Sequence, residues 1–195
     1  VGDVHGHFST MVRLLRASER KLGINLSYVL QVGDLEPVRD EADLESVACP
    51  EKYRHMGDFP HVASGVTPIP WPTYFIGGNH EPHRFLEGMP DGGMVAPNCR
   101  YLGRVFAGPL EGLEVAGLSG IFSAKWHDQR RPVFAEAANV ALKRWTYFCQ
   151  EDVDQLIRLA KGRSIDVLLL HDWPRGSVKP ANLESLRRRN PRITI

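Results

Sequence analysis

The hydrophobic positions of the chain alternate between short apolar runs and stretches of helical spacing. The apolar runs predict β-strands at residues 1–4, 28–32, 74–76, 100–102, 105–106, 113–118 and 165–170. Helical spacing between these runs predicts helices that separate several of the strands. Strands and helices that alternate in this way indicate an α/β fold.

The helical stretches carry recognisable boundary residues. A first helix is predicted after residue 7, with Ser9 as its N-cap and Phe8, Met11, Val12 and Leu15 on its apolar face. Further helices are predicted at residues 40–47, 151–161 and 183–189. Gly162 is expected to end the second of these, and Asn182 to cap the third. The stretch from Lys125 to Arg144 fits neither pattern.

Composition places the chain among ordinary globular proteins. It has 195 residues, of which 43% are hydrophobic and 24% charged, and this size favours one domain over residues 1–195. The formal net charge of +1 argues against a protein that coats nucleic acid by bulk charge, but it allows a local basic groove. The densest basic run, Arg187-Arg188-Arg189, is interpreted as a solvated helix end.

The cysteines and the apolar runs bear on location. Cys49, Cys99 and Cys149 are odd in number and widely spaced, so they indicate neither a disulfide framework nor a zinc ribbon, and a reducing compartment is favoured. The chain has no apolar run long enough for a membrane span and no secretory signal, so the cytoplasm is expected. The opening Val1-Gly2-Asp3 and the strand-like residues 192–195 indicate that the domain is truncated at both ends.

Polar clusters follow four of the predicted strands: Asp3-Val4-His5-Gly6, Gly33-Asp34, Gly78-Asn79-His80-Glu81 and His171. Each cluster alone is ordinary turn or packing chemistry. In α/β folds, however, ligands bind beyond the carboxyl ends of the strands, where these clusters would meet. Carboxylate, amide and imidazole donors together suit Mn²⁺, Fe²⁺ or Zn²⁺ better than Mg²⁺. Two ions about 3.5–4 Å apart also need a bridging carboxylate.

The order D-x-H, G-D, G-N-H-E and a later strand-borne His resembles the calcineurin-like metallophosphoesterase superfamily. The resemblance implies a four-layer α/β/β/α sandwich with the metals at the carboxyl ends of the strands. It implies that Asp3 and His5 hold one metal, that Asp34 bridges, and that Asn79 and His171 hold the second. His80 would be the general acid or a donor to the phosphoryl oxygen. The final G-H-x-H motif of the superfamily is absent from the chain.

A narrower resemblance is to the RNA lariat debranching enzymes, which cut 2′–5′ phosphodiester bonds in branched RNA. It rests on the strings RDEADL at 39–44, PEKYRHM at 50–56, FIGGNHE at 75–81, GGMVAPN at 92–98, YLG at 101–103, GLSGIF at 117–122 and HDWPR at 171–175. In that family the segment after the G-I-F string forms a lariat-recognition loop, which would match residues 126–131 and continue towards Trp145 and Tyr147. Those enzymes often carry Cys where this chain has Asp3, so two similar metal sites are expected here.

Several aromatic and cationic residues are candidates for binding the substrate. Such residues suit stacking on unpaired bases and holding backbone phosphates. The candidates are Arg39, Arg54, His55, Trp126, His127 and Arg130. The alternative for the arginines is solvation, and for Trp173, which follows a buried strand and precedes Pro174, packing is favoured.

The expected function is therefore hydrolysis of phosphodiester bonds by a metal-activated water, with two divalent ions, Mn²⁺ favoured over Fe²⁺ and Zn²⁺. The substrate would be a phosphate ester, with branched RNA the case that the narrower resemblance implies; no membrane or protein partner is indicated. One alternative is a phosphomonoesterase or Ser/Thr protein phosphatase. Those phosphatases carry G-D-x-V-D-R-G, whereas this chain reads GDLEPVR at 33–39, which leaves Arg39 or Arg84 for the phosphate. The other is a non-catalytic scaffold of the same fold.

Overall fold

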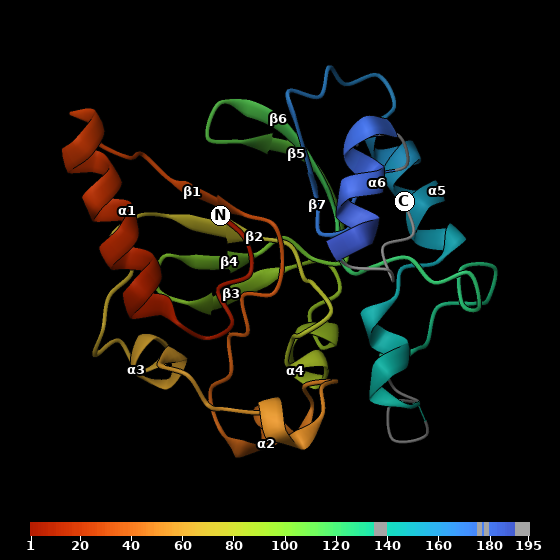
Figure 1. Cartoon of the computed structure of the whole chain (residues 1–195), viewed down its shortest axis with the longest axis horizontal. Helices are drawn as coiled ribbons and strands as arrows, with labels where there is room; N and C mark the ends of the chain where they lie inside the picture. Colours follow the sequence, from red (N-terminus) through yellow and green to blue (C-terminus); the bar gives the residue numbers. More distant parts are fainter. Residues whose placement is uncertain (135–139, 175–176, 178–179, 190–195) are drawn as a thin grey trace.

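Two β-sheets form the centre of the protein in the computed structural model, which describes residues 1–134, 140–174, 177 and 180–189 (Figure 1). The first sheet has the strand order β1-β2-β4-β3, with β1 (Val29–Gln31), β2 (Thr73–Phe75) and β4 (Cys99–Tyr101) parallel and β3 (Gly93–Ala96) antiparallel to β4. The second sheet has the order β5-β6-β7. Its strands β5 (Val105–Leu110) and β6 (Leu113–Leu118) form a hairpin, and β7 (Val167–Leu170) lies parallel to β6.

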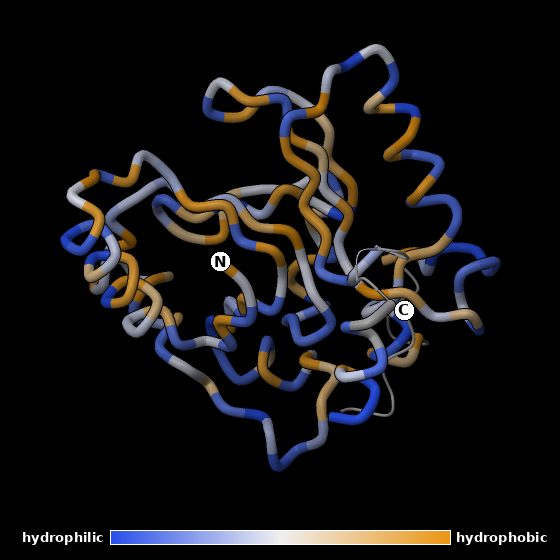
Figure 2. Tube along the Cα trace, turned by 45° about the horizontal axis from the view of Figure 1, so that its top comes forward, coloured by the Kyte–Doolittle hydropathy of each residue, from blue (hydrophilic) through white to orange (hydrophobic). Residues whose placement is uncertain are grey.

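The alternation of side chains along the strands explains how the layers pack. Phe75 and Tyr101 of the first sheet pack against Phe8 and Met11 of helix α1 (Phe8–Leu22), on one face of that sheet. The other face contributes to a second core, in which Ile76, Leu102, Val115 and Leu169 pack together with Leu30 and Tyr74. This second core joins the two sheets, and Figure 2 shows hydrophobic residues concentrated along their strands.

The remaining helices lie around the sheets. They are α2 (Glu41–Glu45), η1 (Glu51–Tyr53), α3 (Phe59–Ala63), α4 (His83–Glu87), η3 (Leu142–Thr146), α5 (Gln150–Ala160) and α6 (Pro180–Arg189). Helix α5 packs on β5 and β6. With helices outside both sheets, the α/β class and the four-layer α/β/β/α sandwich are confirmed.

Most predicted strands are confirmed within one or two residues, but the first is wrong. Residues 1–4 form no strand, although Val1 donates its N-terminal amine to the Leu30 carbonyl and accepts from the Val32 N–H. The extended pairing stops because Asp3 and His5 adopt positive φ angles of 52° and 47°. The sequence pattern did not predict β3, α3 or α4.

Four helices also differ from their predicted bounds or caps, and the helix predicted at 40–47 is the shorter α2, Glu41–Glu45. The first turn of α1 is capped by Asp58, not Ser9: its carboxylate accepts from the backbone N–H groups of Phe8 and Ser9 at 2.7 and 2.8 Å. Asn182 lies inside α6, which begins at Pro180. Helix α5 begins at Gln150, and Gly162 follows it with a φ of 79°, as expected of a helix stop.

Other expectations have mixed outcomes. The arginine run 187–189 ends α6 and is exposed, which confirms a solvated helix end. Residues 192–195, predicted to be strand-like, lie outside the described residues, as do residues 135–139 of the stretch that fitted neither pattern. The cysteines at 49, 99 and 149 are buried and unpaired. Among the helices of the described residues, none combines the length and apolarity that crossing a membrane requires.

Candidate metal centre

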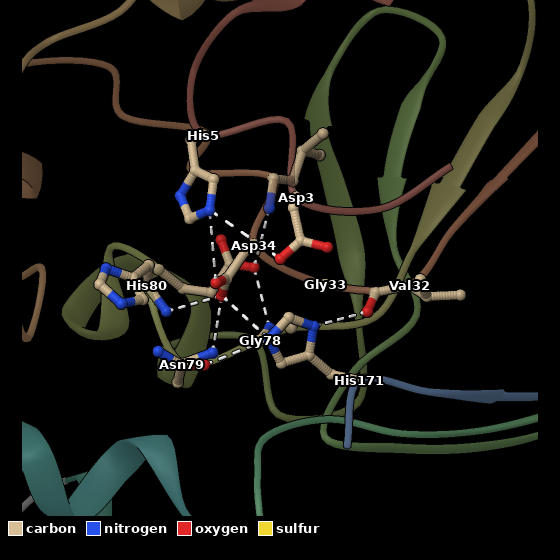
Figure 3. Close-up of polar contacts among 12 residues, drawn as sticks. Asp3, His5, Val32, Gly33, Asp34, Gly78, Asn79, His80 and His171 are labelled. Carbon is tan, nitrogen blue, oxygen red and sulfur yellow. Dashed lines mark hydrogen bonds and ion pairs between the residues drawn. The ribbon is translucent and has the colours of Figure 1, made fainter. Parts of the chain in front are cut away.

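The five predicted metal ligands converge where the strands β1, β2 and β7 end (Figure 3). Residues 3–6 run alongside residues 33–35 through three backbone hydrogen bonds, from Asp3 N to Gly33 O, His5 N to Asp34 O and Gly6 N to Leu35 O. Asn79 follows β2, and His171 follows β7 of the other sheet. Both sheets therefore contribute to one cluster, the candidate metal centre, formed by Asp3, His5, Asp34, Asn79 and His171.

Asp34 lies at the middle of this centre. Its carboxylate is buried, and Oδ1 accepts hydrogen bonds from the backbone N–H groups of Asn79 and His80, both at 2.8 Å. Oδ1 also lies 3.4 Å from Nε2 of His171, whereas Oδ2 lies 3.7 Å from Nε2 of His5. The two oxygens thus face different histidines, which is the arrangement that a carboxylate bridging two ions needs.

Charge stabilisation within the centre shifts two pKa values in opposite directions. Burial alone would raise the pKa of Asp34, but its hydrogen bond and charge interaction with His171 bring it below the usual value. Burial likewise opposes protonation of His171, yet the hydrogen bond with Asp34 raises its pKa to about 9. Asp34 is therefore anionic, and an ion bound at Nε2 of His171 would displace the proton that Asp34 stabilises there.

His171 is oriented by its other ring nitrogen. Nδ1 lies 2.8 Å from the carbonyl oxygen of Val32, which can only accept, so Nδ1 carries a hydrogen. Nε2 is then directed to the centre, 3.2 Å from Oδ1 of Asn79. This pairing of a ligand histidine with a backbone carbonyl is typical of metal sites.

Asp3 and His5 complete the donor set on the solvent side. Oδ1 of Asp3, whose side chain is 68% exposed, lies 3.9 Å from Nε2 of His5. Ligand atoms of Asp3, Asp34 and His171 lie within 4.8 Å of one another. Carboxylate and imidazole donors at this spacing fit Mn²⁺, Fe²⁺ or Zn²⁺.

Two glycines are required by the close approach of the ligand loops. A Cβ on Gly78 would lie 2.1 Å from Oδ1 of Asp34, and a Cβ on Gly33 would lie 2.5 Å from Nδ1 of His171. Gly33 also has a φ of 100°, which L-residues with a side chain rarely adopt. Only glycine at these positions lets the three loops come together.

His80, the predicted general acid, lies at the edge of the centre. Its side chain is 32% exposed, and its ring lies edge-on to that of His5, with 5.5 Å between the ring centroids. Its backbone N–H is fixed by Asp34. A partly exposed imidazole held beside the metal ligands is placed to donate a hydrogen bond to a bound phosphate ester.

Two buried glutamates of the site were not given roles by the sequence reasoning. Glu81 accepts from the backbone N–H groups of Leu35, Glu36 and Gly78 at 3.2, 3.0 and 2.9 Å, so it ties the loop after β1 to the loop after β2. Burial raises its pKa to about 8. Glu36 accepts from Nδ1 of His5 at 3.0 Å. The signal that could have found Glu36 is its spacing from Asp34, which equals that of His5 from Asp3.

Arg39, a predicted substrate residue, is engaged within the protein. Its guanidinium pairs with Asp43 at 2.7 and 3.0 Å and lies 3.4 Å from the ring centroid of Phe85. The Asp43 partner raises the pKa of Arg39 further above its usual value. Asp43 thus occupies two of the five N–H donors of the guanidinium.

Arg54 and His55 lie near the ligand loop that carries His5. His55 is exposed and stacks on His7, with 5.8 Å between the ring centroids. The next residue but one, Gly57, lies against Gly6, and the backbone N–H of Asp58 donates to the Gly6 carbonyl. This segment therefore borders the candidate metal centre.

The predicted recognition segment 126–131 is packed on residues that follow it. The ring centroid of Trp126 lies 4.6 Å from Nζ of Lys125 and 5.2 Å from Cζ of Arg144, and His127 hydrogen-bonds Gln150 at 3.0 Å. The side chain of Arg130 is exposed. Trp145, towards which the loop was expected to run, is buried, and its carbonyl accepts from buried Arg104.

Asp172, the residue after His171, contacts Phe122, which precedes that segment. One carboxylate oxygen of Asp172 accepts from the backbone N–H of Phe122, and the other accepts from that of Trp173. The packing role favoured for Trp173 is wrong, because its side chain is 67% exposed. Among the described residues two large aromatic side chains, Phe122 and Trp173, thus stand exposed beside His171.

Comparison with known proteins agrees with this geometry. The family model "Calcineurin-like phosphoesterase" matches residues 1–193. The chain is 36% identical over 191 residues to a lariat debranching enzyme of Entamoeba histolytica, covering 98% of this chain and 53% of that protein. It is 38% identical to those of Danio rerio and Homo sapiens, covering 96% and 95% of this chain but 33% and 34% of theirs. The chain thus spans about a third to a half of the length of these relatives.

Two findings lead to the same assignment. The family model extends over nearly the whole chain, and the donors of the candidate metal centre come from four separate segments. The chain belongs to the calcineurin-like phosphoesterase family.

Proposed function

We propose that the protein is a binuclear-metal phosphodiesterase that hydrolyses the 2′–5′ linkage of branched RNA. The observation that carries the proposal is the position of Asp34, whose two carboxylate oxygens face His5 on one side and His171 on the other. The named activity of the debranching relatives, 35–38% identical in sequence, supports branched RNA as the substrate.

Asp3, His5 and Asp34 would hold one ion, and Asp34, Asn79 and His171 the other, with Mn²⁺ favoured. Two bound ions lower the pKa of water and offset the negative charge that develops on a phosphoryl group. The protein's part is to keep these donors in place: Val32 orients the ring of His171, and Glu81 ties together the loops that bear Asp34 and Asn79.

His80 acts on the substrate side of the centre. Its backbone N–H is fixed by Asp34, and its partly exposed ring lies beside the ring of His5, so the imidazole borders the candidate metal centre. It donates a proton to the leaving oxygen, or a hydrogen bond to a phosphoryl oxygen. A positioned acid of this kind contributes about 10²–10⁴ in rate.

The substrate surface includes Arg54 and His55 on one segment, and Trp126, His127 and Arg130 on another. The exposed Trp173, which follows His171 by two residues, adds an aromatic face for an unpaired base. The phosphate-clamping role of Arg39 is disfavoured, because Asp43 and Phe85 already hold its guanidinium.

A phosphomonoesterase or protein phosphatase is the second candidate, and the presence of the five ligands Asp3, His5, Asp34, Asn79 and His171 argues against a scaffold. The pairing with Asp43 weakens a phosphate-binding role for Arg39 in a phosphatase, whereas the other candidate, Arg84, is exposed. The three buried, unpaired cysteines support a reducing compartment such as the cytoplasm as its location.

The test is hydrolysis by the Mn²⁺-loaded protein of two matched oligonucleotides, one with a 2′–5′ branch and one with only 3′–5′ linkages, beside a monoester control. Selective cleavage at the branch is expected. Cleavage of the linear oligonucleotide or monoester without cleavage of the branch would contradict the substrate assignment and leave the metal chemistry in place.

A further inference from the structure

The segment Asp34-Leu35-Glu36 repeats the geometry of Asp3-Val4-His5. The first and third residues of both segments have left-handed backbone conformations, with φ values of 52° at Asp3, 47° at His5, 52° at Asp34 and 52° at Glu36. The middle residues, Val4 and Leu35, are buried in the same core. Such conformations are uncommon outside glycine and persist where the surrounding structure determines them. Glu36 therefore occupies the same position in its segment, residues 34–36, as His5 occupies in residues 3–5.

Buried contacts fix the position of the Glu36 side chain. Its backbone N–H donates to Oε2 of Glu81 at 3.0 Å, and the residue is only 7% exposed. Oε1 lies 3.0 Å from Nδ1 of His5 and 3.8 Å from Nδ1 of His80. Only the first of these distances is that of a hydrogen bond.

The Glu36 contact determines which nitrogen of His5 can bind a metal. A carboxylate can only accept, so Nδ1 of His5 carries the hydrogen and Nε2 keeps its lone pair. Nε2 is the atom that faces the other ligands, 3.7 Å from Oδ2 of Asp34 and 3.9 Å from Oδ1 of Asp3. Free imidazole has no such constraint, and either tautomer is available to it.

We propose that Glu36 is a positioning residue that holds His5 in the Nδ1–H tautomer and thereby sets the affinity of the ion bound by Asp3 and His5. The inference rests on the proposed binuclear centre. Loss of a partner of this kind lowers metal affinity by about 10–100-fold. The effect should fall on one ion, because the ring of His171 is oriented by the Val32 carbonyl and not by Glu36.

His5, Glu36 and His80 also form a group whose ligand atoms lie within 4.8 Å of one another. The alternative role for Glu36 is therefore that of a direct metal ligand. The 3.0 Å contact favours the hydrogen bond, because it uses the nitrogen of His5 that points away from Asp3 and Asp34. A direct ligand and a positioning residue differ in what substitution does to the tautomer of His5.

The experiment compares Glu36→Met with Glu36→Gln. Methionine is similar in length to glutamate, is also unbranched at Cβ and has no comparable acceptor, whereas glutamine keeps an oxygen. The histidine tautomers are read by ¹⁵N NMR of the protein without added metal, and the two Mn²⁺ affinities by calorimetric titration. His171 serves as an internal control, and Glu45→Met, an exposed site on α2, as the control for loss of a carboxylate.

In the unsubstituted protein, His5 should be protonated at Nδ1. Glu36→Met should shift it to Nε2–H and weaken one Mn²⁺ equivalent by about 10–100-fold, with the other equivalent and His171 unchanged. The Mn²⁺ affinity of Glu36→Gln should lie between those of the wild type and Glu36→Met. Wild-type His5 protonated at Nε2, or a Met variant with wild-type tautomer and affinities, would overturn the proposal.

Two further outcomes would also overturn the proposal. Equal weakening of both Mn²⁺ equivalents would mark a general structural role for Glu36. Loss of one Mn²⁺ equivalent in both variants, with His5 still protonated at Nδ1, would mark Glu36 as a direct ligand. If Glu36→Met does not fold by circular dichroism, the wild-type tautomer and Glu36→Gln decide the matter. The NMR readout needs no substrate, so a failure here is separate from a failure of the proposed hydrolysis.

Discussion

The carboxylate of Asp34 accepts a 2.8 Å hydrogen bond from the backbone N–H of His80. The residue placed to bridge two ions therefore also holds the residue placed to act on the substrate. The same oxygen also accepts from the N–H of Asn79. Asp34, on the loop after β1, therefore fixes the loop after β2 at its two candidate functional residues, Asn79 and His80. Ligand geometry and acid placement are thus set by one buried side chain.

Asp34→Asn should remove both ions together. The amide oxygen can still accept from the N–H groups of Asn79 and His80, so the fold should persist, but the negative charge that a bridge needs is lost. Mn²⁺ content measured by elemental analysis after dialysis should fall from two equivalents to near none. Asp166→Asn, on the loop before β7, is the control. Retention of both ions would show that Asp34 does not bridge.

His80→Ala should lower kcat by about 10²–10⁴ without loss of metal, since the side chain is proposed to act on the ester and not on the ions. The measurement is steady-state cleavage of the branched oligonucleotide, whose sugar alkoxide leaving group needs the proton, beside metal analysis of the same sample. His61→Ala, an exposed histidine of α3, should be indistinguishable from wild type. Unchanged turnover in His80→Ala would remove His80 from the mechanism.

Gly78→Ala should abolish tight metal binding, because its Cβ would lie 2.1 Å from Oδ1 of Asp34 and must displace it. Gly108→Ala on β5 is a matched control, since its Cβ would meet Phe106 at an ordinary 3.6 Å. Calorimetric Mn²⁺ titration of the two variants gives the comparison. Similar affinities in both would mean that the ligand loops adapt.

Burial raises the pKa of Glu81 to about 8, so its carboxylate is anionic above that pH, and there Glu81→Gln should lower the free energy of unfolding by about 1–3 kcal/mol, the cost of leaving a buried donor unsatisfied. Oε1 of Glu81 accepts from Leu35 and Gly78, and Oε2 accepts from Glu36, so the amide can serve only one side. Glu81→Leu, which satisfies none of the three donors, should cost more. Urea denaturation measures both, and equal stability of the Gln variant and wild type would contradict the role of Glu81 as a tie.

Trp173→Ala should weaken binding of an oligonucleotide and leave a substrate without bases unaffected. Base stacking on an aromatic side chain contributes about 1–3 kcal/mol, so KM for the branched oligonucleotide should rise by about 5- to 160-fold. Turnover of bis-p-nitrophenyl phosphate should not change. Ile157→Ala, another exposed hydrophobic residue, controls for general surface effects. Equal losses on both substrates would point to a structural role.

The meeting of Asp34, Asn79 and His171 could be expected from the sequence because each follows an apolar run, and strand ends meet in space. The role of each residue in the ligand set, and the places of Asp3 and His5 in it, came from the resemblance to the metallophosphoesterases. Glu36 and Glu81 could not be predicted, because their roles depend on backbone N–H groups and a histidine nitrogen that only the folded loops bring near. Asp58 as the cap of α1 was hidden for the same reason, as it lies 50 residues from Phe8.

The donors come from both sheets, and this has a consequence for the whole molecule. An ion held by Asn79 and His171 joins the loop after β2 to the end of β7, and so works as a non-covalent cross-link between the two halves of the sandwich. A ligand that binds only the folded chain at 100 times its Kd adds about 2.7 kcal/mol to the free energy of unfolding. Metal supply would then govern how long the folded protein survives, apart from any turnover.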